Sequence, residues 1–400
     1  MRDLTASQRK IIGSERHVWP NELAFAEAIY AERLELIQED ILARGLSVVI
    51  LFDPENMYWL TGYQTIGYFT FQAMCIPASG KPVIVTRVVN RDMALALPTI
   101  GNAIAVFDTQ DHVDILEAYL KDTVPTGQIG IDTTSRYLNI CDYTRLVDRL
   151  GGRFKPFINV IEAHRMVKTL CELDRMRAAA SAVKAGIDAA LKMIAVGKTD
   201  NDLAAALYQG SIAAGSEYIG HPPMVVTGPR SELCFALWKR NTIEKGDVVL
   251  LEGAGCVDRY HAMMSRSAVV GKATDEHKAT ADALVEILET AIDTIKPGVT
   301  AGEVDFACRQ KVEKRGLGQY FKSRTAYGIG IGFPPNWAEG HIYSLRPNDP
   351  MVLQPNMTFH VIPTMFRTGF GMAISDSVRV TEDGCEVLTN YPRDLMEIDA

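Results

Sequence analysis

Residues 248–267, VVLLEGAGCVDRYHAMMSRS, contain the pattern from which the fold of this chain is predicted. The first four residues are apolar and predict a strand buried on both faces, which leads directly into Glu252. A turn follows, and the amphipathic run 260–270 predicts a return strand. Because a carboxylate is costly to desolvate, we expect Glu252 to serve chemistry or a cation. The alternative is a structural ion pair with Arg259 or Arg266.

Composition excludes several classes of protein. Four hundred residues exceed one ordinary core, so two domains are expected. An apolar content of 47% with 22% charged residues is normal for a globular protein. A net charge of −8 and a pI near 5.6 argue against nucleic acid as a partner, because phosphate binding needs a basic surface. No apolar run is long enough for a transmembrane helix, so no membrane partner is expected.

The N-terminus and the cysteines point to the cytoplasm. The first ten residues, MRDLTASQRK, are polar and predict no signal peptide. The seven cysteines are scattered and include no CxxC pair. This usage is typical of reduced thiols and excludes both a disulfide scaffold and a zinc–cysteine site.

Strands and helices alternate over the first 165 residues, which predicts an N-terminal α/β domain. The turn residues 53–56 are expected to lead into an aromatic loop that ends near Phe71. The predicted helices are 21–45, 114–121 and 135–150, and the predicted strands are 47–52, 73–76, 82–86, 103–107 and 128–132.

Residues 166–400 are expected to form a second domain of α+β type. Its predicted helices are 171–196, 201–214, 275–294 and 301–315, and its predicted early strands are 224–227 and 248–251. The last ninety residues are rich in strand and turn signals. Two helix pairs, each followed by strands, predict an internally duplicated domain.

These motifs resemble the creatinase/aminopeptidase P superfamily (family M24), whose catalytic domain has the pita-bread fold. In its metal-dependent members the first strand carries Asp-x-Gly, and later motifs supply a second Asp, a His and two Glu as ligands. By this resemblance the five ligand positions are Glu252, Met263, Tyr327, Ile362 and Ser375. Divalent cations need several hard oxygen or imidazole donors that converge on one point. The resemblance therefore implies the metal-free branch, with no metal site and no cofactor.

Within that branch the chain most resembles the ectoine hydrolases, which, like creatinase, cleave C–N bonds in small zwitterions. The likeness is carried by residues 252–261, 334–339, 344–347 and 353–360. Three departures leave the substrate open. Phe235 stands nearest the slot where metal-free relatives carry a proton-shuttling His, residues 64–69 lack an expected Trp, and residues 340–342 replace an Arg-Thr pair.

Three residues are the candidate catalytic groups. Glu252 either attacks the carbon of an amidine or ureido group, or activates water as a general base. His261 and His360 are each able to supply the imidazole that is missing at Phe235. For either histidine, the alternative is a hydrogen-bonded strand residue with no catalytic role.

Seven further residues are candidates for substrate binding. Glu339 is expected to hold a cationic amine or amidine, with Trp337 as its aromatic wall. Tyr327 is expected to donate a hydrogen bond at the former metal position. The other candidates are His221, His341, Tyr68 and Phe69.

Resemblance to creatinase also implies a homodimer. In creatinase the N-terminal domain caps the active site of the other subunit, which gives the loop containing Tyr68 and Phe69 its expected role. The competing functions are an Xaa-Pro type metallopeptidase, a silent pita-bread protein that binds a small molecule or a partner, and a lyase acting on a charged osmolyte. The lost ligands disfavour the peptidase.

Overall fold

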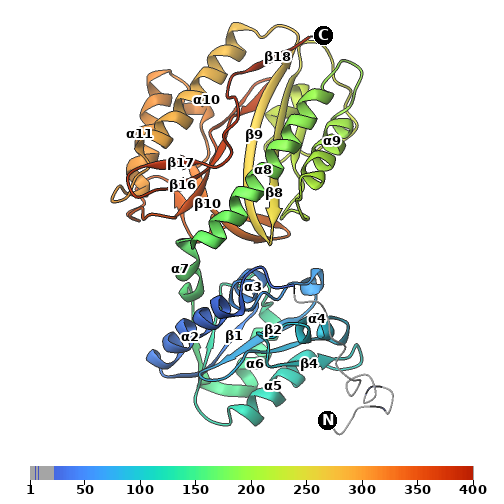
Figure 1. Cartoon of the computed structure of the whole chain (residues 1–400), viewed down its shortest axis with the longest axis vertical. Coiled ribbons are helices and arrows are strands. Elements are labelled where there is room, and N and C mark those ends of the chain that lie inside the picture. Colours follow the sequence, from blue (N-terminus) through green and yellow to red (C-terminus); the bar gives the residue numbers. More distant parts are fainter. Residues whose placement is uncertain (1–4, 6–7, 9–21, 400) are drawn as a thin grey trace. The chain divides into compact units, whose positions relative to one another are not determined.

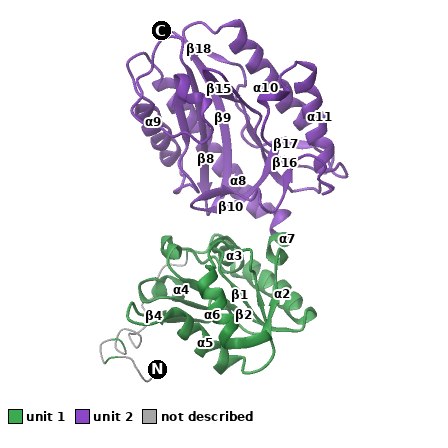
Figure 2. Cartoon of the chain, turned by 180° about the vertical axis from the view of Figure 1, so that it is seen from behind, with its two compact units in different colours: residues 1–164 green, residues 165–400 purple. Residues whose placement is uncertain are grey.

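The computed structural model describes residues 5, 8 and 22–399. The chain divides into two compact units, residues 1–164 and 165–400 (Figure 2). The sequence places the domain boundary between residues 165 and 166. Most of the N-terminal decapeptide, on which the expectation of no signal peptide rests, lies outside the described residues.

Unit 1 is built around a six-stranded mixed sheet in the order β4-β3-β2-β1-β5-β6 (Figure 1). β1 pairs antiparallel with β2 and parallel with β5. The strands are β1 (Leu46–Leu51), β2 (Gln72–Pro77), β3 (Val83–Arg87), β4 (Asn102–Val106), β5 (Gln128–Ile131) and β6 (Phe154–Pro156). The helices are α2 (Glu27–Ala43), α3 (Pro54–Thr61), α4 (Arg91–Leu95), α5 (His112–Thr123) and α6 (Ile140–Leu150), and α7 (Val160–Met166) follows β6. This arrangement confirms the predicted α/β character.

Helix α3 stands where the sequence predicts a turn and an aromatic loop. Asp53 is extended, Pro54 begins the helix, and Gly62 ends it with φ of 75°. All eight helical residues are buried. An Asp-Pro pair opens turns and helices alike, because proline fits the first helical position. The prediction was therefore wrong, and tertiary burial of the segment decided for the helix.

Unit 2 contains four long helices and a ten-stranded sheet. The helices are α8 (Leu170–Met193), α9 (Asp200–Ala213), α10 (Asp275–Thr294) and α11 (Ala301–Lys314). The strands are β7 (Met224–Thr227), β8 (Val248–Val257), β9 (Tyr260–Val270), β10 (Ala326–Phe333), β11 (Asn336–Ala338), β12 (Ser344–Leu345), β13 (Thr358–Val361), β14 (Thr364–Arg367), β15 (Phe370–Ala373), β16 (Asp376–Val380), β17 (Cys385–Val387) and β18 (Met396–Ile398).

Two helix pairs pack on the central sheet, which runs β17-β16-β13-β10-β9-β8-β7 (Figure 1). α8 and α9 share a core with β8 through residues such as Val183, Leu207 and Leu251. α10 and α11 share a second core with β13 through residues such as Leu284 and Phe359. The order helix, helix, strands thus occurs twice in an α+β unit, and the predicted fold class is confirmed.

The hairpin of β8 and β9 is longer than the sequence predicts. β8 pairs with β9 continuously from Val248 to Val257, so Glu252 lies in the middle of the strand and not at its end. The turn consists of Asp258 and Arg259, with φ of 48° and 63°. Positive φ at both central residues is what a tight hairpin requires.

Gly255 lies where β8 approaches α8 closely. A Cβ atom on Gly255 would lie 2.0 Å from the backbone oxygen of Ala179 in α8. The strand therefore approaches the helix more closely than any side chain permits. Gly255 therefore serves helix–strand packing within a continuous strand.

Two further observations concern the cysteines and the helices. All seven cysteines lie in the described part of the chain, and each is a free thiol. No helix among the described residues is long and apolar enough to cross a membrane.

Candidate active site

Unit 2 contains a cavity of about 670 Å³. Its floor comes from β7 and β8, and its walls come from β15 and from residues of the segments 231–236, 322–324 and 336–341. Strand alternation explains the floor, because Leu250 and Glu252 point to this face of β8 while Leu251 points to α8 and α9. Five of the ten predicted site residues line this cavity: Glu252, Tyr327, Trp337, His221 and His341.

Glu252 is a buried carboxyl group with only 3% of its surface exposed. It lies between Met224 of β7 and Ser265 of β9 in the sheet register. Burial raises the pKa of Glu252 to about 8. Among the described residues, no cationic side chain forms an ion pair with it. The carboxyl group is therefore poised to titrate near neutral pH, as a general base requires.

The two arginines considered as structural partners of Glu252 bind elsewhere. Arg266 forms a buried ion pair with Asp376 at 3.0 Å. Arg259 donates to the carbonyl oxygens of Gly332 and Tyr218, at 2.6 and 2.7 Å. The alternative of a structural ion pair for Glu252 is thus contradicted.

One wall of the cavity is aromatic. The rings of His221 and Trp337 have their centroids 3.4 Å apart, with an interplanar angle of 31°. The indole Nε1 of Trp337 donates to the hydroxyl oxygen of Tyr327 at 3.3 Å. Burial, followed by the charge of Glu252, raises the pKa of Tyr327 well above its usual value. Tyr327 is therefore a neutral phenol beside the carboxyl group.

His360 lies behind Tyr327 and does not line the cavity. Its Nδ1 is 2.7 Å from the Tyr327 hydroxyl, and its Nε2 is 2.7 Å from the Ser375 hydroxyl. Burial and the charge of Arg266 lower the pKa of His360 to about 3. The imidazole is neutral and reaches the cavity only through Tyr327.

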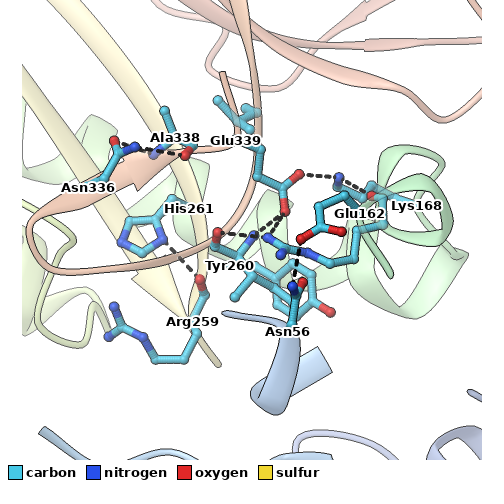
Figure 3. A network of polar contacts seen from close by, with 12 residues as sticks. Asn56, Glu162, Lys168, Arg259, Tyr260, His261, Asn336, Ala338 and Glu339 are labelled. Atoms are coloured by element: carbon cyan, nitrogen blue, oxygen red, sulfur yellow. Dashed lines mark hydrogen bonds and ion pairs between the residues drawn. The ribbon is translucent and has the colours of Figure 1, made fainter. Parts of the chain in front are cut away.

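His261 does not line the cavity, and Figure 3 shows its ring bonded to the backbone of Arg259. Its Nδ1 donates to the carbonyl oxygen of Arg259 at 2.9 Å, and its Nε2 accepts from the amide of Gly220 at 3.0 Å. Burial, followed by the charge of Arg259, holds the pKa of His261 well below its usual value. Both ring nitrogens are occupied, so the geometry gives this histidine no access to substrate.

Glu339 is buried and does not line the cavity, and Figure 3 shows its carboxylate bonded to Lys168. Its two carboxylate oxygens bind Arg165 at 2.6 Å and Lys168 at 2.7 Å. Burial alone would raise the pKa of Glu339, but the charges of Lys168 and Arg165 outweigh burial and lower it. The expectation that Glu339 binds a cationic substrate is wrong because two protein cations already neutralise it.

The remaining candidates lie in two places. His341 is exposed and lines the cavity of unit 2. Tyr68 and Phe69 belong to unit 1, where Tyr68 packs edge-on against Tyr137 and Phe69 is 77% exposed. Their contribution to the site of a second subunit stays a prediction.

The donor set at the five former ligand positions does not fit a pair of divalent cations. Only Glu252 carries a carboxylate, and Ser375 is already bonded to His360. Met263 is fully buried in β9. The described residues contain no group of three or more His, Cys, Asp or Glu side chains that could hold a metal ion.

Sequence reasoning missed the polar residues at the edge of the cavity. Lys322 and Arg324 lie two residues apart just before β10, and Cys234 lines the cavity beside Phe235. Phe235 has φ of 62° and is 75% exposed. The Lys-Ser-Arg run directly before the Tyr327 motif is the signal that could have revealed the two cations.

Two protein-family models and several known proteins match this chain. Residues 174–382 match metallopeptidase family M24, and residues 33–167 match the creatinase/prolidase N-terminal domain. The ectoine hydrolase of Halomonas elongata is 29% identical over 393 residues, covering 93% of this chain and 98% of that protein. The probable dipeptidase PepE of Mycobacterium bovis is 27% identical over 377 residues, covering 94% and 98%.

A solved structure has the same fold. The prolidase of Thermococcus sibiricus matches with a TM-score of 0.83 at 23% identity, covering 92% of this chain and 99% of that one. The match to the catalytic family spans more than half of the chain. This chain therefore belongs to metallopeptidase family M24, with a creatinase/prolidase N-terminal domain and a pita-bread catalytic domain.

Proposed function

We propose that this chain is a metal-independent hydrolase that cleaves a C–N bond of a small zwitterionic or cyclic amidine substrate. Glu252 is the reacting group, as nucleophile or as general base. The observation that carries the proposal is the state of this carboxyl group. It lines the cavity of unit 2, has no cationic partner among the described residues, and has a pKa raised by burial to about 8.

The charges around the cavity suit a substrate that carries a carboxylate. Lys322 and Arg324 bring two positive charges to the cavity edge, against the single acid Glu252. Arg324 is fixed in place because its Nη1 donates to the Gly340 carbonyl oxygen at 3.0 Å and to the Ser344 hydroxyl at 2.8 Å. An anchored guanidinium is a suitable partner for a carboxylate.

The aromatic wall suits the other end of such a substrate. Trp337 is 2% exposed and lines the cavity beside Tyr327 with its ring packed against His221, and a planar amidinium group is attracted to the aromatic atoms that line the cavity. A molecule held by Arg324 at one end and by Trp337 at the other is a small zwitterion. Its C–N bond would then face Glu252.

Glu252 has two balanced routes to hydrolysis. As a base, it takes a proton from water, whose oxygen attacks the carbon, and the leaving nitrogen receives a proton as the C–N bond breaks. As a nucleophile, its oxygen bonds to the carbon, the nitrogen leaves with a proton, and water then releases the carboxylate. Both routes need an ionised Glu252 and an acid beside the leaving nitrogen.

The relationship to the Halomonas ectoine hydrolase supports ectoine as the first compound to test. We also propose that the enzyme is a homodimer, in which Tyr68 and Phe69 of one subunit complete the cavity of its partner. The exposure of Phe69 supports this role, because large exposed aromatic side chains are often used in contacts.

The test compares wild type with Glu252→Gln on ectoine, hydroxyectoine, creatine, N-acylated diamines and an Xaa-Pro dipeptide, each with and without chelator. We expect turnover of a non-peptide compound that chelator leaves unchanged, and a loss of about 10³-fold or more in Glu252→Gln. Equal turnover by both proteins would remove Glu252 from the mechanism. Dipeptide cleavage abolished by chelator would establish the peptidase, and turnover of nothing would favour a silent binder.

A further inference from the structure

A chain of hydrogen-bonded side chains leads from the cavity into the protein. We call Tyr327, His360, Ser375 and Ser265 the Tyr327 chain. Successive links, from the phenol oxygen to His360 Nδ1, from Nε2 to the Ser375 hydroxyl, and from there to the Ser265 hydroxyl, each measure 2.7 Å. Only Tyr327 lines the cavity, and the other three residues are fully buried.

The His360 imidazole of the Tyr327 chain has one N–H hydrogen to donate. Because His360 is neutral, one of its ring nitrogens donates and the other accepts. If Nδ1 carries the hydrogen, His360 donates to the Tyr327 oxygen and accepts from the Ser375 hydroxyl. If Nε2 carries the hydrogen, Tyr327 donates its hydroxyl hydrogen to His360 Nδ1 and has no hydrogen to donate into the cavity.

The surrounding bonds fit the first arrangement. The Ser375 oxygen accepts from the Ser265 amide at 2.7 Å and can accept from the Ser265 hydroxyl, which leaves its own hydrogen for Nε2. The Tyr327 oxygen then accepts from two N–H groups, His360 Nδ1 and Trp337 Nε1. Two donors on one phenol oxygen stabilise the phenolate and direct the hydroxyl hydrogen into the cavity.

We infer that Tyr327 is the general acid that protonates the leaving nitrogen, and that His360 is the positioning residue that holds it in this role. The inference rests on the proposed function. The Tyr327 O–H bond breaks, an N–H bond forms, and the C–N electron pair passes to nitrogen. In the base route, the proton that Glu252 took from water returns to the phenolate. In the nucleophile route, the phenolate takes a proton from the water that releases Glu252.

The ionisation state of Glu252 controls when Tyr327 can give up its proton. While Glu252 is ionised, its charge opposes loss of the Tyr327 proton. Once Glu252 has taken a proton or bonded to carbon, that charge is gone. The phenolate therefore becomes easier to form at the moment when the leaving nitrogen needs a proton.

The first test is the tautomer of His360 in the full-length protein, read from ¹⁵N chemical shifts of labelled histidine and assigned with His360→Gln. We expect a hydrogen on Nδ1, a bare Nε2 and no change down to about pH 5. A hydrogen on Nε2 would overturn the inference, because Tyr327 would then donate inward. This measurement needs no substrate, so it separates the inference from the proposed function.

The second test uses the compound that wild type turns over. We expect Tyr327→Phe to lower kcat by about 10²- to 10⁴-fold with KM changed less than about threefold, and His360→Gln to lower kcat by about tenfold or more. The matched control is Tyr343→Phe, which removes a buried hydroxyl bonded to the Ile329 and Thr358 carbonyl oxygens and should keep wild-type kcat.

A solvent isotope effect distinguishes an acid role of Tyr327 from a merely structural one. Wild type should show one on kcat, and Tyr327→Phe should show a different one because its acid is water. If Tyr327→Phe keeps kcat within threefold while Glu252→Gln is inactive, the inference fails and the proposed function stands. If no compound in the panel is turned over, the proposed function fails instead.

Discussion

Glu252 and Glu339 are buried glutamates of the same unit, with exposed fractions of 3% and 1%, yet their environments act in opposite directions. Glu339 sits between two cations that lower its pKa, whereas burial raises the pKa of Glu252 to about 8. Burial is therefore common to both, and the neighbours decide which one is reactive. A buried acid signals chemistry only where its charge is left uncompensated.

The largest expected effect is a loss of stability when the charge of Glu339 is removed. Glu339→Gln removes the carboxylate that pairs with the buried Lys168 at 2.7 Å and with Arg165 at 2.6 Å, which should destabilise the protein by about 3–5 kcal/mol. Thermal unfolding measures this as a drop of about 10 °C in Tm. A Tm within two degrees of wild type would show that the two cations find other partners and that the contrast with Glu252 is overstated.

Glu252→Gln should have the opposite effect on stability, because Glu252 has no cationic partner among the described residues. The folded-state pKa of Glu252 lies above its unfolded value of 4.5, at about 8, so its contribution to stability is lost as pH rises between these values. Glu252→Gln removes that loss and should stabilise the protein at about pH 9 by on the order of 2 kcal/mol. Tm measured at about pH 9 and at about pH 5 should differ from wild type only at the higher pH.

Lys168→Met removes one of the two cationic partners of Glu339, which brings its environment closer to that of Glu252. Arg165 remains, but one charged hydrogen bond of the carboxylate is lost, at a cost of about 1.5 kcal/mol. The pKa of Glu339 should rise because burial then meets less opposing charge. Urea unfolding against pH should show a smaller gain in stability between acid and neutral pH than wild type shows. An unchanged profile would mean that Arg165 alone fixes the ionisation.

The smallest effect concerns Cys234, which lines the cavity with Glu252. Burial and then the charge of Glu252 raise the pKa of the Cys234 thiol. At about pH 9, Glu252→Gln should therefore speed alkylation of Cys234 by iodoacetamide a few-fold, because the thiolate is the reacting form. Peptide mass spectrometry reads the rate. Cys141, exposed in unit 1, is the internal control and should react at the same rate in both proteins.

Regular elements with strong periodicity were well predicted from the sequence. The return strand 260–270 and the helix 275–294 have the bounds observed for β9 and α10. Threonine caps mark other helix starts, as at Thr199, whose hydroxyl accepts from the Asp202 amide. Local signals sufficed there because each element's own residues satisfy its termini and its buried face.

Other features depended on contacts that are distant in sequence. Helix α3 and the extension of β8 were missed because burial and the approach of Gly255 to α8 decided them. His261 and Glu339 resemble site residues by type, but backbone groups and cations far along the chain occupy them. Lys322 was missed because it reaches the cavity from a loop without a periodic pattern.

The sequence by itself determined the family, the long helices and the residue types at the five ligand positions, because these follow from residue types at fixed spacings. Only the tertiary structure decided which buried acid is paired with cations and which histidine is bonded to the Tyr327 phenol. A pKa and a tautomer depend on the groups within a few ångströms, and those groups come from strands and helices far apart in the chain.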